Sequence, residues 1–243
     1  MKSVLILGAT SDVAMAVANT FAKEKYNIVL AARDAQRLQP LKSDLAIRFN
    51  VNCEVKEFDA LDFDNHASFV ASLQPLPLVT VCAFGFLGDE DAARTTTGET
   101  IKMIHSNYTG AVSILNGVAQ AYKTKGEGTI IGISSVAGSR GRSSNYMYGS
   151  AKAGFTAYLS GLRNELFHHK VHVLTVLPGF IASKMTAHLQ LPAMLTATPA
   201  QVANAIYKGF AKQKNVIYVK WFWAWIMLII RLIPEPIFKR LKM

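Results

Sequence analysis

Short hydrophobic runs rich in β-branched residues alternate along this chain with longer amphipathic segments. Runs of the first kind predict strands, and segments of the second kind predict helices. The predicted strands are Ser3–Leu7, Asn27–Ala31, Asn52–Phe58, Leu78–Cys82, Gly128–Ile133, Val171–Leu177 and Asn215–Val219. The predicted helices are Asp12–Lys25, Ala35–Phe49, Phe63–Leu73, Thr100–Lys123, Tyr146–Lys170 and Pro199–Lys212.

Strands separated by helices indicate right-handed parallel crossovers. We therefore expect one α/β domain over residues 1–219, with a doubly wound, Rossmann-type parallel sheet of about seven strands and helices on both faces. Residues 220–243 form a C-terminal extension. The stretch Ile181–Ala197 shows neither pattern, and we interpret it as an irregular lid at the carboxyl edge of the sheet. Thr198, Pro199 and Gln201 predict a capped start for the helix that follows.

The bulk composition suits a well-cored globular protein, with 51% hydrophobic and 17% charged residues. Cys53 and Cys82 lie in predicted strands, which indicates buried free thiols in a reducing compartment, the cytoplasm. The histidines show no ligand spacing, so no metal site is predicted. Residues 201–243 carry eight Lys and Arg but one acidic residue, while the rest of the chain is nearly neutral. This distribution argues against a nucleic-acid surface and indicates a local role for the tail.

The turn Gly8-Ala9-Thr10-Ser11-Asp12 follows the first predicted strand and opens the first helix. Such a turn presents free amides at a helix N-terminus to a nucleotide pyrophosphate. Gly8 would make the tight turn, Thr10 and Ser11 would supply hydroxyls, and Asp12 would cap the helix. Two of the three glycines typical of dinucleotide-binding turns are absent, so an ordinary strand-to-helix turn is the alternative.

The end of the second strand indicates which cofactor is preferred. NAD-binding folds usually place an acid at this strand tip, but Ala32 stands here and Arg33 follows. Arg33 suits a 2′-phosphate, which predicts NADP(H). The alternative is NAD(H), with Asp34 on the ribose and Arg33 as a solvated charge. Asp59, after the third strand, either accepts a hydrogen bond from the adenine amino group or caps the next helix.

Tyr148 and Lys152 are four residues apart in a predicted helix and therefore share one face. An ammonium group beside a phenol favours the phenolate, so we expect the tyrosine pKa to fall from its usual ~10. Such a tyrosine can give a proton to a carbonyl oxygen or take one from an alcohol. The pair alone is also compatible with an ordinary helix surface.

Three further motifs occur in a fixed order around this pair: Asn107-Tyr108-Thr109-Gly110, Ile133-Ser134-Ser135-Val136-Ala137-Gly138, and Pro178-Gly179. With them, residues 1–219 resemble the short-chain dehydrogenase/reductase family. The resemblance implies NAD(P)-dependent interconversion of a ketone and a secondary alcohol. One departure is Cys82-Ala83-Phe84-Gly85, where the family usually has Asn-Asn-Ala-Gly. We expect Phe84 to form a wall of the cofactor cleft.

The resemblance also implies the catalytic residues. Ser135, rather than Ser134, would hydrogen-bond the substrate oxygen, and Tyr148 would act as general acid in reduction and as base in oxidation. Lys152 would hold the nicotinamide ribose, and Asn107 would anchor a water that relays protons to it. The implied cofactor contacts are Gly8, Thr10, Ser11, Asp12, Arg33, Asp59, Gly85, Tyr148, Lys152, Pro178, Gly179, Ile181 and Ser183.

All three tryptophans, Trp221, Trp223 and Trp225, lie in one apolar run of the tail, residues 221–230. Ten helical residues cannot cross a hydrocarbon core of ~30 Å. Tryptophans flanked by Lys and Arg are typical of a segment that lies in a membrane interface on the cytoplasmic side. A subunit interface and a wall of the substrate pocket are the alternatives.

The glycine turn and the basic aromatic tail together are also similar to reductases that act on keto-sugars carried by polyprenyl phosphate. This similarity implies a lipid-linked or otherwise hydrophobic carbonyl substrate. The alternative function is a soluble NAD(H)-dependent dehydrogenase of a small metabolite, with the tail as an oligomer interface. A non-catalytic nucleotide-binding sensor is the third reading. By analogy with the family, a homo-oligomer is expected.

Overall fold

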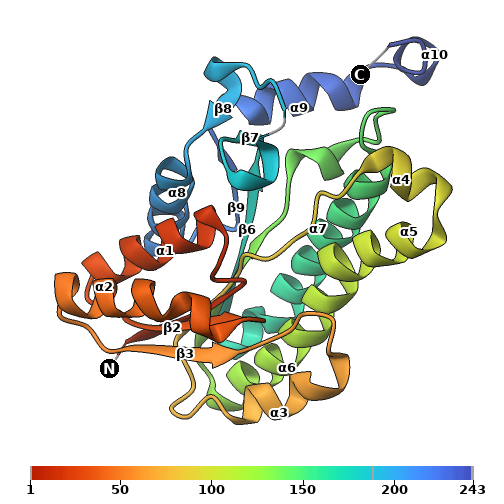
Figure 1. The fold of residues 1–243 in the computed structure, drawn as a ribbon. Helices are drawn as coiled ribbons and strands as arrows, with labels where there is room; N and C mark the ends of the chain where they lie inside the picture. Colours follow the sequence, from red (N-terminus) through yellow and green to blue (C-terminus); the bar gives the residue numbers. More distant parts are fainter. Residues whose placement is uncertain (1, 188, 242–243) are drawn as a thin grey trace.

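A seven-stranded parallel sheet forms the centre of the computed structural model, which describes residues 2–187 and 189–241 (Figure 1). Its strands are β1 (Ser3–Leu7), β2 (Asn27–Ala32), β3 (Cys53–Glu57), β4 (Val79–Cys82), β5 (Gly128–Ile133), β6 (Val171–Pro178) and β9 (Val216–Val219). They lie in the order β3-β2-β1-β4-β5-β6-β9, and every neighbouring pair is parallel. The predicted fold class is confirmed.

Helices cover both faces of this sheet (Figure 1). The helices α1 (Asp12–Lys23), α2 (Gln39–Phe49) and α8 (Pro199–Ala211) cover one face, and α3 (His66–Ala71), α6 (Gly110–Lys125) and α7 (Tyr146–Leu166) cover the other. Side chains of a strand alternate between the two faces, so Val4 and Ile6 enter one core cluster while Leu5 and Leu7 enter the other. Burial on both faces explains why the strands are apolar throughout.

Side-chain caps fix the starts of two of these helices. Ser11 has an extended backbone and accepts a hydrogen bond from the Ala14 amide at 3.1 Å, so it caps α1. The prediction that Asp12 is the cap was wrong, because Asp12 is already the first helical residue. At α8, Thr198 and Gln201 form the predicted capping box.

The middle of the chain is more divided than its pattern predicts. The expected helix Thr100–Lys123 splits into α5 (Thr97–Ile104), a π-helical turn (His105–Thr109) and α6. The expected helices at 35–49 and 63–73 open with 3₁₀ turns at Ala35–Leu38 and Phe63–Asn65, and a 3₁₀ turn at Phe167–His169 follows α7. A further helix that the sequence did not reveal is α4 (Glu90–Thr95).

The segment predicted as an irregular lid contains short regular elements. Strand β7 (Phe180–Ile181) pairs in parallel with β8 (Thr196–Ala197), and 3₁₀ turns occupy Lys184–Thr186 and Ala193–Leu195. Two-residue strands are too short to produce an alternating pattern, so the sequence could not reveal them. We call Phe180–Ala197 the lid.

The tail folds back onto the domain as α9 (Phe222–Leu232) and α10 (Glu235–Phe238). Trp223 and Met227 are buried in one cluster with Val136 and Leu177. The Trp223 indole Nε1 donates to the Leu195 carbonyl of the lid at 3.2 Å. Figure 1 shows α9 running beside β7 and β8. Within residues 2–187 and 189–241, every helix is too short or too polar to span a membrane.

Arg140 fastens the end of α9 to the loop after β5. Its Nη1 donates to the carbonyls of Ile230 and Ile233, both at 2.6 Å, and its Nη2 pairs with Glu235 at 2.8 Å. The guanidinium also lies 3.6 Å from the centroid of the Phe238 ring. The last carbonyls of a helix lack intrahelical partners, so Arg140 acts as a side-chain cap from outside the tail.

We expect Arg140→Met to release this end of α9, because the freed carbonyls and the apolar face lose their anchor. Chemical denaturation should show the free energy of unfolding lowered by about 2 kcal/mol. Hydrogen exchange should rise in residues 222–232. Glu235→Gln is the matched control, since this carboxylate is 71% exposed and its ion pair should contribute less than about 0.5 kcal/mol. Unchanged hydrogen exchange of residues 222–232 in Arg140→Met would contradict the role of Arg140 in anchoring α9.

Candidate active site

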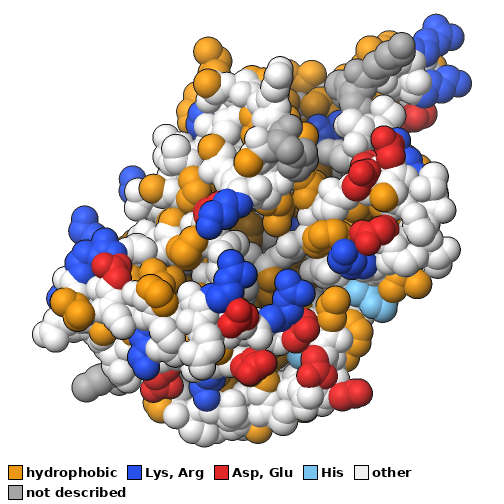
Figure 2. All heavy atoms as spheres, in the orientation of Figure 1, with side chains coloured by type: hydrophobic (Ala, Val, Ile, Leu, Met, Phe, Trp, Pro, Cys, Tyr) orange, Lys and Arg blue, Asp and Glu red, His pale blue; other side chains and the backbone are white. Residues whose placement is uncertain are grey.

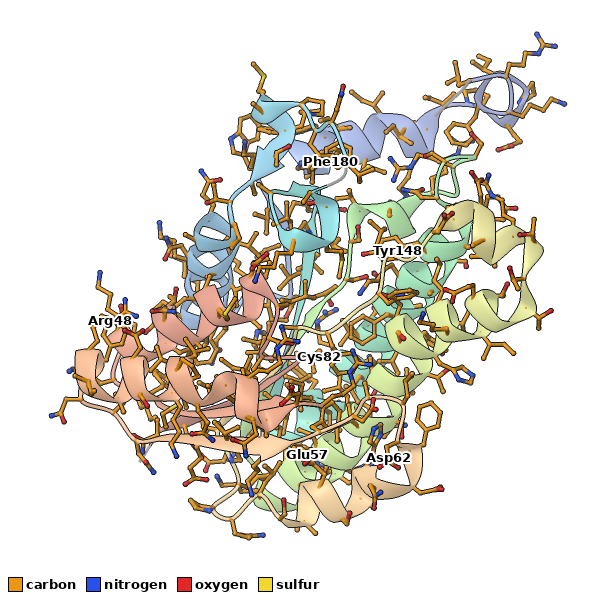
Figure 3. The ribbon with its side chains drawn as sticks, viewed as in Figure 1. Arg48, Glu57, Asp62, Cys82, Tyr148 and Phe180 are labelled. Atoms are coloured by element: carbon orange, nitrogen blue, oxygen red, sulfur yellow. The ribbon has the colours of Figure 1, made fainter. Side chains whose placement is uncertain are left out.

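A cavity of about 390 Å³ lies at the carboxyl ends of the central strands, between α7 and the lid. Figure 3 shows Tyr148 at the start of α7, Phe180 on the lid side and Cys82 deeper, at the end of β4. The predicted site residues that line the cavity are Thr10, Ser11, Asp12, Gly85, Ser135, Tyr148, Lys152, Pro178, Gly179, Ile181 and Ser183. The predicted residues outside its lining are Gly8, Arg33, Asp59 and Asn107.

Ser135 and Tyr148 both line this cavity, and their side chains interact there. The Ser135 hydroxyl accepts from the Ala137 amide at 3.1 Å, which leaves its own proton for the tyrosine or for a substrate oxygen. Burial raises the pKa of Tyr148 to about 12, and the hydrogen bond with Ser135 opposes this rise. The expectation of a lowered tyrosine pKa was therefore wrong, and the phenol is protonated at neutral pH.

Burial also shifts the pKa of the neighbouring Lys152. It is 4% exposed, and burial lowers the pKa of its amine to about 8. The Nζ lies 5.8 Å from the centroid of the Tyr148 ring and donates to the Ile133 carbonyl at 3.3 Å. With this pKa the amine is still mostly protonated near pH 7, so burial of the phenol itself accounts for the rise in the pKa of Tyr148.

The neighbouring Ser134 serves the attachment of α7 to the sheet. Its hydroxyl donates to the Lys152 carbonyl at 2.9 Å and lies 2.7 Å from the Thr156 hydroxyl. The serine whose side chain interacts with Tyr148 is Ser135, and its catalytic role stays a prediction.

Glu90 of α4 holds the first turn of α7 in place. Its carboxylate accepts from the amides of Met147 at 2.8 Å and Tyr148 at 3.4 Å. Asn145 occupies the N-cap position but makes no side-chain cap bond to the described residues. Glu90 thus supplies the missing cap, and its negative charge suits the positive end of the helix dipole. The carboxylate fixes the turn that carries Tyr148.

Asn107 lies in the π-helical turn and is 1% exposed. Its Nδ2 donates to the carbonyls of Phe86 at 2.6 Å and Met103 at 2.9 Å, and its Oδ1 accepts from the Phe86 amide at 3.1 Å. A Cβ at Gly85 would lie 2.9 Å from the Asn107 Oδ1 and 3.3 Å from the Lys152 Nζ. The amide therefore ties the segment after β4 against Lys152, and the water relay stays a prediction.

The turn after β1 fits a dinucleotide phosphate. Gly8 has φ +82°, and a Cβ there would lie 2.6 Å from the Cβ of Phe84, so the turn requires glycine. Thr10 and Ser11 line the cavity at the N-terminus of α1, where amides favour an anion. Phe84 lines the cavity, as expected.

The carboxylate of Asp12 connects this turn to the lid. It accepts from the Lys184 amide at 2.7 Å and lies 3.9 Å from the Lys184 ammonium. A direct contact between Asp12 and a cofactor stays a prediction. Ile181 and Ser183 lie in the same lid, and Ser183 forms a capping box with Thr186.

The residues predicted to select the cofactor lie outside the cavity lining. Arg33 is exposed directly after β2 and makes no hydrogen bond or ion pair with any described residue. Asp34 likewise makes no side-chain cap bond in the described structure. Asp59 accepts from the Leu61 amide at 3.0 Å, whereas the N-cap of the next turn is Asp62. The alternative of Asp59 as that cap is therefore wrong.

Arg142, Asn145 and Trp223 are among the cavity residues that the sequence did not predict as individual site residues. Arg142 and Asn145 lie between Ser135 and Tyr148 in the sequence, so their position between two site motifs was an available signal. Trp223 reaches the cavity because α9 docks on the lid. A wall of the substrate pocket was one of the alternatives for the tail in the sequence analysis.

We expect Lys152→Met to be at least as stable as the wild type near pH 7, because the burial cost of the ammonium disappears. The fall in pKa from 10.5 to about 8 corresponds to at most about 3 kcal/mol. Below pH 8 the lysine is protonated in both the folded and unfolded states, so this cost is complete. As pH rises from about 8 to 10.5 the unfolded state binds more protons, wild-type stability rises and the advantage of the variant shrinks.

Urea denaturation near pH 7 and near pH 10 measures this difference, with Lys208→Met on the exposed side of α8 as the control. A variant clearly less stable than the wild type near pH 7 would contradict a destabilising ammonium at position 152.

Comparison with known proteins identifies the family of this chain. Residues 2–192 match the family model described as short chain dehydrogenase. Over 241 residues the chain is 36% identical to an uncharacterized oxidoreductase of Mycobacterium tuberculosis, an alignment that covers 98% of this chain and 96% of that protein.

Solved structures share the fold over most of the chain. The bulky-bulky ketone specific alcohol dehydrogenase from Comamonas testosteroni superposes with a TM-score of 0.83 at 21% identity, covering 99% of this chain and 95% of that one. A short-chain dehydrogenase from Sphingobium yanoikuyae in complex with NADPH gives 0.81 at 23% identity, covering 94% and 92%. The chain therefore belongs to the short-chain dehydrogenase family of NAD(P)-dependent oxidoreductases.

Proposed function

We propose that this protein is an NADP(H)-dependent oxidoreductase that interconverts a ketone and a secondary alcohol on a hydrophobic or lipid-linked substrate. The observation that carries the proposal is that Ser135, Tyr148 and buried Lys152 line one cavity together with Thr10 and Ser11 of the glycine turn. A bound nicotinamide dinucleotide supplies the hydride chemistry. The residues of the chain orient the substrate and move the proton.

In reduction, the substrate oxygen takes a proton from the Tyr148 hydroxyl while Ser135 donates a hydrogen bond to the same oxygen. A phenol whose pKa is about 12 holds its proton at neutral pH, which suits the reductive direction. The amine of Lys152, with its pKa of about 8, gains and loses protons near neutral pH. It is therefore the group that restores the proton of Tyr148. Asn107 keeps Gly85 and the strand end pressed against this amine.

The remaining cavity wall favours an apolar substrate body. Its apolar lining beyond the reacting groups includes Leu87, Phe180, Met185, Leu189 and Trp223. Pockets of this kind bind apolar groups, with a few polar groups fixing the orientation. The tail thus contributes Trp223 to the cavity wall. This contribution does not depend on what the outer face of α9 contacts.

We expect Tyr148→Phe to lower kcat for ketone reduction by about 100-fold or more, because the general acid is lost while the ring and its packing stay. The dissociation constant for NADPH, measured by fluorescence titration, should change less than about threefold. Tyr146→Phe is the control, since this tyrosine is 44% exposed on the same helix. Full turnover in Tyr148→Phe would refute the proposed chemistry.

We expect Arg33→Ala to weaken NADPH binding about tenfold or more and NADH binding little, because only NADPH presents a 2′-phosphate. Titration of both cofactors measures the difference. Arg37→Ala is the matched control, an exposed arginine four residues further on. Equal loss for both cofactors would argue against the phosphate contact. Loss of NADH binding in Asp34→Ala would favour the NAD(H) alternative.

We also propose that the outer face of α9 contacts the surface of an anionic membrane. This apolar stripe consists of Trp221, Trp225, Leu228, Ile229 and Leu232, all exposed. Their helical spacing places them opposite Trp223 and Met227, which pack on the domain. Arg231, Lys239 and Arg240 are exposed nearby, and Figure 2 shows Lys and Arg side chains gathered where α10 lies. Basic residues beside an apolar helix face attract anionic lipid.

Substitution tests this surface better than deletion of residues 220–243, which would also remove the cavity residue Trp223. We expect Trp225→Ser/Ile229→Ser to lose sedimentation with vesicles of phosphatidylcholine and phosphatidylglycerol while keeping its activity. Ile47→Ser, an exposed apolar residue of α2, is the control. A variant that keeps vesicle binding would contradict membrane contact through this stripe. A change of oligomer size in gel filtration would assign the stripe to a subunit interface instead. The homo-oligomer stays a prediction from the family.

A further inference from the structure

Arg142 and Asn145 each carry a buried polar atom without a partner in the cavity wall. Both lie in the loop between the 3₁₀ turn Val136–Ser139 and α7, and both line the same cavity as Ser135 and Tyr148. The Nε of Arg142 and the Oδ1 of Asn145 are buried, yet neither makes a hydrogen bond to any described residue. Buried polar atoms almost always have partners in folded proteins, so this pair requires an explanation.

Arg140, two residues before Arg142, shows what a structural arginine looks like in the same loop. Its guanidinium has two helix carbonyls, the Glu235 carboxylate and the Phe238 ring as partners. Arg142 has neither an ion pair nor a side-chain hydrogen bond among residues 2–187 and 189–241. A partly buried cation without a counter-ion is unfavourable to the fold. The contrast indicates that Arg142 serves a ligand rather than the fold.

The charges around the cavity leave Arg142 without a carboxylate of its own. The acidic side chain in the described lining is Asp12, which is engaged by Lys184 through the backbone amide at 2.7 Å and the ammonium at 3.9 Å. Lys152 and Lys184 are the other basic side chains of the lining. Burial lowers the pKa of Arg142, but a guanidinium stays charged throughout the working range of pH. The excess of cationic groups favours an anion in the cavity.

We propose that Arg142 binds an anionic group of the substrate, a carboxylate or a phosphate, and that Asn145 Oδ1 accepts a hydrogen bond from a hydroxyl or N–H beside it. The planar guanidinium matches either anion with paired hydrogen bonds, and a pair of this kind adds orientation as well as affinity. The inference rests on the proposed function and names its substrate class: a ketone, or its alcohol, with an anionic group and an apolar body.

The arrangement assigns the parts of such a substrate to different walls. Ser135 and Tyr148 hold the reacting oxygen, and Arg142 and Asn145 hold the anionic end. Trp223 and the lid cover the apolar body. Arg142 is a specificity residue in this scheme, because it acts on a group of the substrate that does not react.

The test compares two ketones that differ in one charge, 3-oxodecanoate and its methyl ester, with NADPH as reductant. We expect the wild type to prefer the acid. Arg142→Met should lower kcat/KM for the acid about 10- to 100-fold, the range of a lost charge-assisted hydrogen bond, and leave the ester within about threefold. Arg142→Lys should recover part of the loss, since it keeps the charge but not the planar fork.

A matched variant separates a specific contact from the loss of a positive charge elsewhere on the protein. Arg231→Met removes an exposed arginine from the last turn of α9, outside the cavity. This variant should change the preference for the acid less than about threefold. An equal loss of acid and ester in Arg142→Met, or no preference in the wild type, would overturn the inference.

Direct binding separates this inference from the proposed function. Isothermal titration with decanoate, decyl phosphate and inorganic phosphate needs no turnover. Binding of decyl phosphate that Arg142→Met loses and Arg231→Met keeps supports the anion site even if no ketone is reduced. If the protein binds inorganic phosphate as well, the natural ligand is a small soluble anion. If it binds decyl phosphate but not inorganic phosphate, the natural ligand is a lipid phosphate. Failure of the wild type to bind any of the three would overturn the site.

Discussion

The hydrogen-bonded register of the parallel sheet is the constraint on which the site depends. Leu7 pairs with Cys82, Cys82 with Gly132 and Gly132 with Thr175, so four strands are aligned in one row across the sheet. The segments that leave these strands supply the glycine turn, the wall at Phe84, the serine pair and Pro178-Gly179. Because parallel strands end at one edge, residues more than a hundred positions apart meet there without any further device.

Burial at this edge shifts the pKa values of the two residues proposed to move the proton. It raises the pKa of Tyr148 and lowers the pKa of Lys152, so both groups are shifted toward their neutral forms. Strongly shifted pKa values of this kind are typical of functional sites, which agrees with the proposed roles of the two residues. Cys82, beneath them, follows the same rule: burial raises the pKa of its thiol to about 12, which keeps it uncharged.

The sequence predicted those parts of the molecule that depend on local spacing. The seven strands, the Thr198 capping box and the shared helix face of Tyr148 and Lys152 follow from periods of two and 3.6 residues. Short elements such as β7 and α4 were not predicted, because a segment of two to six residues is too short to show a hydrophobic periodicity. The predicted shift of the tyrosine pKa had the wrong sign, because the spacing of Tyr148 and Lys152 does not reveal how deeply the phenol is buried.

Long-range contacts account for the other omissions. Glu90 caps α7 across 57 positions of the chain, and the Trp223 indole bonds to the lid across 28. Asp12 was expected to cap a helix but is bonded to Lys184, 172 positions away. None of these partners is adjacent in any local pattern, and each depends on how complete elements dock.

The contact between Gly179 and Trp223 couples the turn after β6 to α9, although the proposed proton transfer involves neither residue. A Cβ at position 179 would overlap the indole, so the turn after β6 and the docked tail occupy space that neither can use alone. In related chains the two positions must therefore change together: a larger residue at position 179 requires a smaller one at position 223 or a tail placed elsewhere. Such paired variation would trace, through evolutionary history, when this branch acquired a C-terminal wall for its cavity.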